Sequence, residues 1–197
     1  MAIFKQLKKV FVHIPRTGGT SVTKAIKDKL DTSNHVEDFK HYDINYYKRF
    51  LEYQDYEYFT IVRNPYSRII SYYNYHSNVD ANVIKKLDGI ENQKERFLYY
   101  LSLNLNDSPC KYDREKPLLV YKKQSDYINP EVKVLKFENI HEDINQYLKI
   151  NIKLDKDRGY DLNKKYYNMD EIFSSETIKI INGYFNDDFK NFKYDIL

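Results

Sequence analysis

The sequence predicts a three-layer α/β domain in which helices flank a mainly parallel sheet. Short apolar runs rich in β-branched and aromatic residues alternate with longer stretches whose apolar residues recur at helical spacing. A strand, a sharp turn and a helix follow one another twice, over residues 8–30 and 56–76. The chain has 197 residues, 42% of them hydrophobic, which suffices for one domain with a core over residues 1–197.

The first strand-turn-helix segment contains a glycine loop. The run "KKVFVHI" (Lys8–Ile14) is typical of a buried parallel strand. Two of the five glycines of the chain follow in a short loop. Apolar residues then recur at Val22, Ile26 and Leu30, with lysines on the other side, which predicts an amphipathic helix.

The second segment repeats this order without a glycine. The run "YEYFTIVRNP" (Tyr56–Pro65) predicts another buried strand. Asn64 suits the N-cap of a helix, and Pro65 suits its first position. We expect that helix to continue through about His76.

The remaining segments predict one strand, three helices and several loops. The strand is Glu131–Ile140. The helices are Asn92–Leu105, Glu142–Lys149 and a closing helix over residues 174–192, capped by Ser174 or Ser175. The loops cover residues 77–89, 108–117 and 155–170.

Composition and charge exclude several classes of protein. The 32 Lys and Arg residues face 29 Asp and Glu, and this near balance does not predict a nucleic-acid partner. The single Cys110 excludes an internal disulfide and a multi-cysteine metal site. No apolar run approaches the roughly 20 residues that span a bilayer, and no signal peptide is evident, so we expect a cytoplasmic protein. The oligomeric state is left open.

The loop in "HIPRTGGTS" combines features that bind phosphate-like anions. Gly18 and Gly19 allow a tight turn that directs backbone N–H groups toward one anion, and the next helix adds its positive end. Arg16 supplies charge, and hydroxyl groups come from Thr17, Thr20 and Ser21. The alternative is a plain strand-to-helix turn with capping hydroxyls. Neither a Walker A motif nor a Rossmann G-x-G-x-x-G occurs in the chain.

A second anion site is predicted from "VRNPYSRIISYY". Arg63 stands at the carboxyl end of its strand, where open α/β sheets bind their ligands. Ser71 falls about two turns into the next helix, so both residues could bind one phosphate. The alternative is that Arg63 pairs with a carboxylate while the helix merely tolerates Ser71.

Together, these two motifs resemble those of sulfotransferases that use 3′-phosphoadenosine 5′-phosphosulfate. The likeness is to the carbohydrate (Golgi-type, sulfotransferase family 2-like) branch and its small bacterial and viral relatives. It implies a P-loop-like α/β fold and transfer of a sulfuryl group to a hydroxyl, with a carbohydrate as the expected acceptor and no metal. By this likeness Arg16, Thr17, Gly18, Gly19, Thr20 and Ser21 hold the 5′-phosphosulfate. Arg63 and Ser71 hold the 3′-phosphate.

The resemblance continues downstream but departs from the family pattern at one important position. "KVLKFENIHEDINQYL" is similar to the family's strand ending in R-F-E-N-L with its helix, and "KKQSDYI" is similar to a middle segment containing Q-S-x-Y. The closing segment resembles a helix ending in D-x-x-x-F-x-Y. Arg16, however, stands where most relatives have lysine, which keeps the charge and changes its geometry.

His41 is the predicted catalytic base, alongside Arg16 as the catalytic cation. A histidine near its ordinary pKa of about 6.5 suits removal of the acceptor's hydroxyl proton. Lys40-His41 matches the K-H motif that relatives carry between the two anion sites. Glu37, Asp38 and Asp43 are alternative bases or orienting partners.

Acceptor and lid residues are weaker expectations. Residues 77–89 and 155–170 would provide the acceptor surface, and Lys164 or Lys165 would close over the donor. Two other functions stay open at the sequence level: a nucleotide or small-molecule kinase, and a non-catalytic module that binds a nucleotide, glycan or RNA.

Overall fold

The structure is a computed structural model that describes residues 2–30, 35–36, 41–105, 122–154 and 169–197. The chain forms two compact units, each built from two segments. The sheet unit contains Met1–Arg63 and Gln124–Gly159, and the helical unit contains Asn64–Lys123 and Tyr160–Leu197. Each unit has its own core, and a single domain over residues 1–197 stays a prediction.

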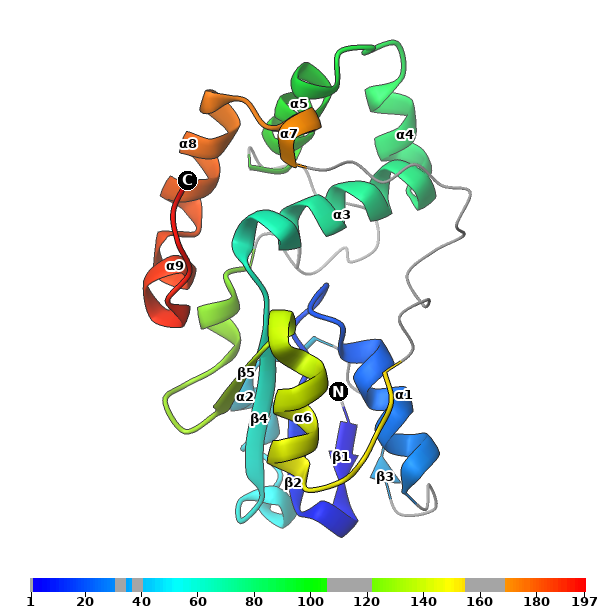
Figure 1. The fold of residues 1–197 in the computed structure, drawn as a ribbon, viewed down its shortest axis with the longest axis vertical. Helices are drawn as coiled ribbons and strands as arrows, with labels where there is room; N and C mark the ends of the chain where they lie inside the picture. The colour runs from blue at the N-terminus through cyan, green and yellow to red at the C-terminus, as the bar shows by residue number, and fades with distance from the viewer. Residues whose placement is uncertain (1, 31–34, 37–40, 106–121, 155–168) are drawn as a thin grey trace. The chain divides into compact units, whose positions relative to one another are not determined.

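The sheet unit contains a five-stranded sheet in the order β3-β1-β2-β4-β5. The strands are β1 (Ala2–Phe4), β2 (Lys9–Val12), β3 (His35–Val36), β4 (Glu57–Val62) and β5 (Lys133–Lys136). β4 pairs in parallel with β2 and β5, whereas β1 is antiparallel to β2 and β3. Four strands therefore run in one direction and only β1 opposes them, which confirms the predicted mainly parallel sheet (Figure 1).

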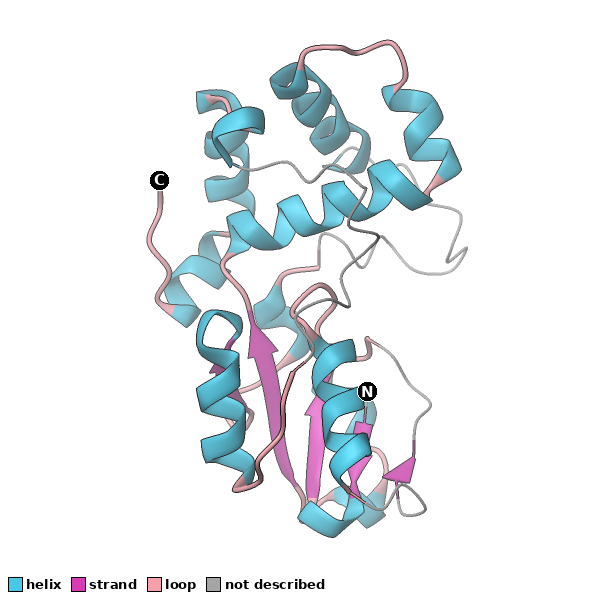
Figure 2. Ribbon diagram, turned by 45° about the vertical axis from the view of Figure 1, so that its right-hand side comes forward, coloured by secondary structure: helices cyan, strands magenta, loops and turns pink. Residues whose placement is uncertain are grey.

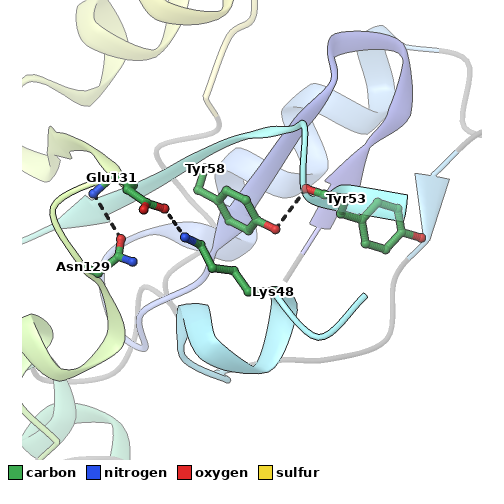
Figure 3. Close-up of polar contacts among 5 residues, drawn as sticks. All are labelled: Lys48, Tyr53, Tyr58, Asn129 and Glu131. Atoms are coloured by element: carbon green, nitrogen blue, oxygen red, sulfur yellow. Dashed lines mark hydrogen bonds and ion pairs between the residues drawn. The ribbon is translucent and has the colours of Figure 1, made fainter. Parts of the chain in front are cut away.

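Helices lie on both faces of this sheet. α1 (Gly19–Lys29) and α6 (Ile140–Leu148) cover one face (Figures 1 and 2), where Phe11 and Phe59 are fully buried. Tyr58 points to the opposite face because side chains alternate along a strand. There its hydroxyl donates to the carbonyl of Tyr53 at 3.1 Å, beside α2 (Ile44–Tyr47) (Figure 3). Short 3₁₀ turns connect the elements: η1 (Lys5–Leu7), η3 (Leu51–Tyr53), η4 (Gln124–Tyr127) and η5 (Phe137–Asn139).

The helical unit packs around aromatic side chains. Its helices are α3 (Pro65–Val79), α4 (Ala81–Leu87), α5 (Gln93–Leu105), α7 (Met169–Ile172), α8 (Ser175–Tyr184) and α9 (Asn186–Phe192). The buried aromatic side chains are Tyr66, Tyr72, Tyr73, Phe97, Tyr100, Phe173, Phe185 and Phe189. His76 belongs to this core, where its Nδ1 lies 2.7 Å from the hydroxyl of Tyr100.

The predicted elements are largely confirmed. The three strands and the helices that follow them are present, with Asn64 capping α3 and Pro65 in its first turn. The loop predicted over 77–89 is wrong, because α3 continues to Val79 and Asp80 caps α4. The closing segment contains two helices, with a break at Phe185, and Ser174 is the cap of the first. β1, β3 and α2 were not predicted, and residues 108–117 and 155–168 lie outside the described part.

Candidate active site

The glycine loop and Arg63 lie at the same edge of the sheet. The loop follows β2, and Arg63 follows β4. These two strands are parallel neighbours, with Val12 paired to Thr60, so their carboxyl ends meet. This is the edge at which open α/β sheets bind ligands. The sequence-predicted loop and arginine are thus brought together.

The loop is held in shape by its own side chains. Thr17 is fully buried, and its hydroxyl donates to the carbonyl of Ile14 at 2.8 Å. Gly18, the N-cap of α1, has a φ of 82°, a left-handed conformation that favours glycine. A Cβ there would lie 2.8 Å from the ring of Phe137. The threonine hydroxyl therefore supports the turn, and glycine at position 18 lets the loop pass close to Phe137.

Gly19 is required by the histidine that ends the preceding strand. A Cβ at Gly19 would lie 2.1 Å from the imidazole of His13. His13 is a buried residue, and its ring packs beside Phe11 with 5.5 Å between the ring centroids. Any side chain at position 19 would displace a buried ring, so His13 shapes the loop.

The beginning of α1 is electropositive. The helix has 11 residues and no acidic residue in its first turn, so its N-terminal N–H groups and dipole favour an anion. Thr20 is exposed and Ser21 is half-buried, so both hydroxyls lie near the protein surface in that turn.

Arg16 and Arg63 are in direct contact. Arg63 Nη1 donates to the carbonyl of Arg16 at 3.4 Å. Arg16 has a φ of 66°, which is uncommon for a residue with a side chain. The two arginines predicted for different phosphates therefore belong to one cluster at the sheet edge.

Two residues that the sequence did not single out hold Arg63. The side-chain amide of Gln124, in η4, binds both the N–H and the carbonyl of Arg63. The ring of Phe137, in η5, lies 4.4 Å from the guanidinium carbon. Both residues lie in segments that resemble the family pattern, and this resemblance could have pointed to them. Neither residue had a predicted role.

Ser71 lies on α3 in the helical unit and is half-buried. Arg68, one turn earlier, is only 2% exposed, and its guanidinium donates to the carbonyl of Lys122 at 3.3 and 3.4 Å. Arg68 is thus engaged in packing within that unit. The meeting of Ser71 and Arg63 on one phosphate stays a prediction.

His41 is placed beside the loop. Its Nδ1 lies 3.1 Å from the carbonyl oxygen of His13, and the two rings are 4.7 Å apart. A carbonyl can only accept, so this bond requires hydrogen on Nδ1, and in the neutral imidazole the lone pair is then on Nε2. That tautomer leaves Nε2 as the atom able to take a proton.

Of the other predicted residues near the donor and the base, the structure describes only Asp43. Asp43 caps α2, accepting from the N–H groups of Asn45 and Tyr46 at 3.1 and 3.3 Å. Lys40, Glu37 and Asp38 lie outside the described residues, as do Lys164 and Lys165.

A cavity of about 440 Å³ lies elsewhere, where β4 and β5 begin. Three of its lining residues form ion pairs: Lys48 binds Glu131 (Figure 3), and Glu57 binds Lys9. The Lys9 ammonium, together with the hydroxyl of Tyr147, lowers the pKa of the Glu57 carboxyl. This cavity is at the opposite edge of the sheet from the glycine loop.

The fold and the glycine loop define the class as a P-loop-like α/β protein. A protein-family model described as "Sulfotransferase family" matches residues 1–195. The chain therefore belongs to the sulfotransferase family and is a transferase. No curated protein and no solved structure matches it.

Among the residues that the structure describes, no helix combines the length and apolarity needed to cross a bilayer. The same part of the chain contains no group of three or more His, Cys, Asp or Glu side chains placed to hold a metal ion.

Proposed function

We propose that this sulfotransferase moves the sulfuryl group of 3′-phosphoadenosine 5′-phosphosulfate to a hydroxyl of a carbohydrate acceptor. The observation that carries the proposal is the contact between Arg63 and Arg16, which brings one arginine from each predicted anion site to the same sheet edge. Membership of the sulfotransferase family supports the reaction type. The donor and the acceptor class follow from the resemblance of the two motifs.

The glycine loop is the proposed site of the 5′-phosphosulfate. Arg16 contributes a planar, permanently charged group, and α1 contributes its positive end. Thr20 and Ser21 add hydroxyl donors from the first turn. Because the Thr17 hydroxyl is bonded to Ile14, we assign the backbone N–H of Thr17, rather than its side chain, to the anion.

Arg63 and Ser71 are the proposed ligands of the 3′-phosphate. An arginine can bind a phosphate through two parallel hydrogen bonds, which fixes orientation as well as adding energy. Binding this remote group orients the donor, so part of its binding energy is expressed as a faster reaction.

His41 is the proposed general base. Its Nε2 takes the proton of the acceptor hydroxyl while that oxygen attacks sulfur in line with the leaving group. The new S–O bond forms as the bond between sulfur and the 5′-phosphate oxygen breaks. The proton ends on His41, and the leaving group is adenosine 3′,5′-bisphosphate. Arg16 and the loop N–H groups stabilise the negative charge that develops on the leaving phosphate.

The experiment that tests this function compares wild type with His41→Ala. Radiolabelled sulfate transfer is measured from 3′-phosphoadenosine 5′-phosphosulfate to a panel of oligosaccharides, a tyrosine peptide and a phenol. We expect transfer to sugars, reduced at least about 100-fold in His41→Ala with unchanged donor binding, because general-base catalysis contributes about that much. His141→Ala, at an exposed position on α6, is the matched control.

The other outcomes separate the rival functions. Near-normal turnover by His41→Ala contradicts the assignment of the base. Transfer to the peptide alone contradicts the carbohydrate acceptor. Turnover of ATP with magnesium and no sulfuryl transfer favours a kinase, and nucleotide binding without any turnover favours a binding module.

A further inference from the structure

Arg63 stands just beyond the last parallel pair of β4, which joins Val62 to Lys136. Beyond this pair, a side chain rather than a neighbouring strand binds the backbone of Arg63. Gln124 Oε1 accepts from the N–H of Arg63 at 2.8 Å, and Gln124 Nε2 donates to the Arg63 carbonyl at 2.9 Å. One amide group thus binds both backbone polar groups of the residue, as a neighbouring strand does.

Gln124 is fully buried. The assignment of its oxygen and nitrogen follows from the partners, since a backbone N–H can only donate and a carbonyl can only accept. A buried amide that satisfies two backbone groups is costly to replace, because its removal leaves both groups without that partner. The residues are 61 positions apart, so this is a tertiary contact.

The side chain of Arg63 is held as well as its backbone. The guanidinium lies over the ring of Phe137 at 4.4 Å, and its Nη1 donates to the carbonyl of Arg16. With Gln124 fixing the backbone, the start of the side chain and its charged end are both constrained. The guanidinium therefore has a defined position before any ligand binds.

We propose that Gln124 is a positioning residue for Arg63 and so sets the selectivity of the site for a 3′-phosphorylated nucleotide. The inference rests on the proposed function, in which Arg63 binds the 3′-phosphate. Gln124 itself is not a proposed ligand of the donor. It acts by fixing the backbone from which the Arg63 guanidinium projects.

The test measures the Kd of adenosine 3′,5′-bisphosphate and of adenosine 5′-monophosphate by titration calorimetry. In Gln124→Met, which keeps the size and loses the amide, we expect the Kd of the bisphosphate to rise roughly tenfold. The Kd of the monophosphate should change much less, because Gln124 reaches the 5′-phosphate loop only through the bond between Arg63 and the Arg16 carbonyl. The readout is the ratio of the monophosphate Kd to the bisphosphate Kd, which falls roughly tenfold in this variant.

A second substitution keeps the inference testable if Gln124→Met does not fold. Gln124→Glu keeps the oxygen that accepts from the Arg63 N–H and loses the donor to the Arg63 carbonyl, so the ratio also falls. Thr60→Val is the control for a purely structural role, since it removes a buried hydrogen bond of 2.7 Å to the Val12 carbonyl. We expect it to lower the melting temperature without changing the ratio.

The outcomes distinguish this inference from the proposed function. If the wild type prefers the bisphosphate and the Gln124 variants keep this preference, the role of Gln124 is contradicted. The proposed function is not affected by that result. Equal weakening of both nucleotides in the Gln124 variants also contradicts the role of Gln124, since that result reports general damage. A wild type that binds both nucleotides equally contradicts the proposed function and the inference with it.

Discussion

Arg16 and His41 share an uncommon backbone conformation, with φ values of 66° and 72°. Such a conformation costs a residue with a side chain about 1 kcal/mol or more, so the surroundings must hold it in place. The Arg16 carbonyl accepts from Arg63, and His41 is bonded through Nδ1 to the His13 carbonyl. Arg16 is therefore fixed through its own carbonyl, and His41 is fixed through its imidazole.

Gly19→Ala tests the shape of the loop. The added methyl group would meet the buried His13 ring at 2.1 Å, so we expect a lower melting temperature and loss of nucleotide binding. Differential scanning fluorimetry with and without adenosine 3′,5′-bisphosphate measures both effects.

Gly183→Ala is the matched control for that substitution. A Cβ at Gly183 meets nothing within 4 Å, and the residue lies in α8. Alanine there is expected to stabilise the protein by up to about 1 kcal/mol. Normal nucleotide binding by Gly19→Ala would contradict the close packing of the loop on His13.

Sequence patterns predict local roles better than tertiary ones. The position of Arg63 at a strand end and the cap at Asn64 follow from neighbouring residues, and both are confirmed. The binding of Gln124 to Arg63 has no local signature, because the partners are 61 residues apart and a buried glutamine looks like any polar residue in a loop. The contact between His13 and Gly19, by contrast, joins residues of one short segment, and the place of His13 at the end of the buried strand already indicates that it shapes the loop.

At the scale of elements, α3 begins with a strong cap. Asn64 accepts from the N–H groups of Tyr66 and Ser67 at 2.9 and 3.4 Å. We expect Asn64→Ala to lower the free energy of unfolding by about 1 kcal/mol, measured by urea denaturation. Asn64→Asp keeps an accepting oxygen and should lose much less. Equal losses in the two variants would show that the cap is not what stabilises this helix.

The first residues of β2 and β4 carry an ion pair whose contribution depends on pH. Lys9 lowers the pKa of Glu57, so the carboxylate stabilises the fold above the ordinary pKa of glutamate, and this contribution is lost as the pH falls through the lowered value. Glu57 is exposed, so we expect Glu57→Gln to cost less than about 1 kcal/mol at neutral pH.

Urea denaturation at several pH values checks that expectation. The difference between wild type and Glu57→Gln should shrink as Glu57 becomes protonated, and it should also shrink in about 1 M salt. A difference that is the same in acid and at neutral pH would contradict an electrostatic origin.

Element prediction succeeded where periodicity was strong and failed where segments were short. β1 has three residues and β3 has two, too few to show an alternating pattern. α4 follows α3 after the single residue Asp80, which caps it, so a polar stretch that looked like a loop is helical. The closing segment kept helical spacing through Phe185 although the hydrogen-bonded helix is interrupted there.

At the scale of the whole molecule, the family match covers residues 1–195 and therefore includes segments of both compact units. The fold class was predictable because each strand-turn-helix segment is formed by consecutive residues with a clear hydrophobic pattern. The division into two units was not, since each unit combines segments that are distant in sequence. No motif in the sequence identifies the acceptor, so the carbohydrate acceptor is proposed from the family resemblance alone.

The most direct test of a site for a 3′-phosphorylated donor is the binding of adenosine 3′,5′-bisphosphate, the product left after sulfuryl transfer. Adenosine 3′,5′-bisphosphate, ADP and AMP are compared by thermal shift at equal concentration. A ligand at 100 times its Kd stabilises by about 2.7 kcal/mol, which corresponds to about 5–10 °C for a protein of this size.

We predict that the bisphosphate gives the largest shift and that Arg63→Ala removes its advantage over ADP and AMP. Equal shifts for all three nucleotides, or no shift with any of them, would contradict a site for a 3′-phosphorylated donor.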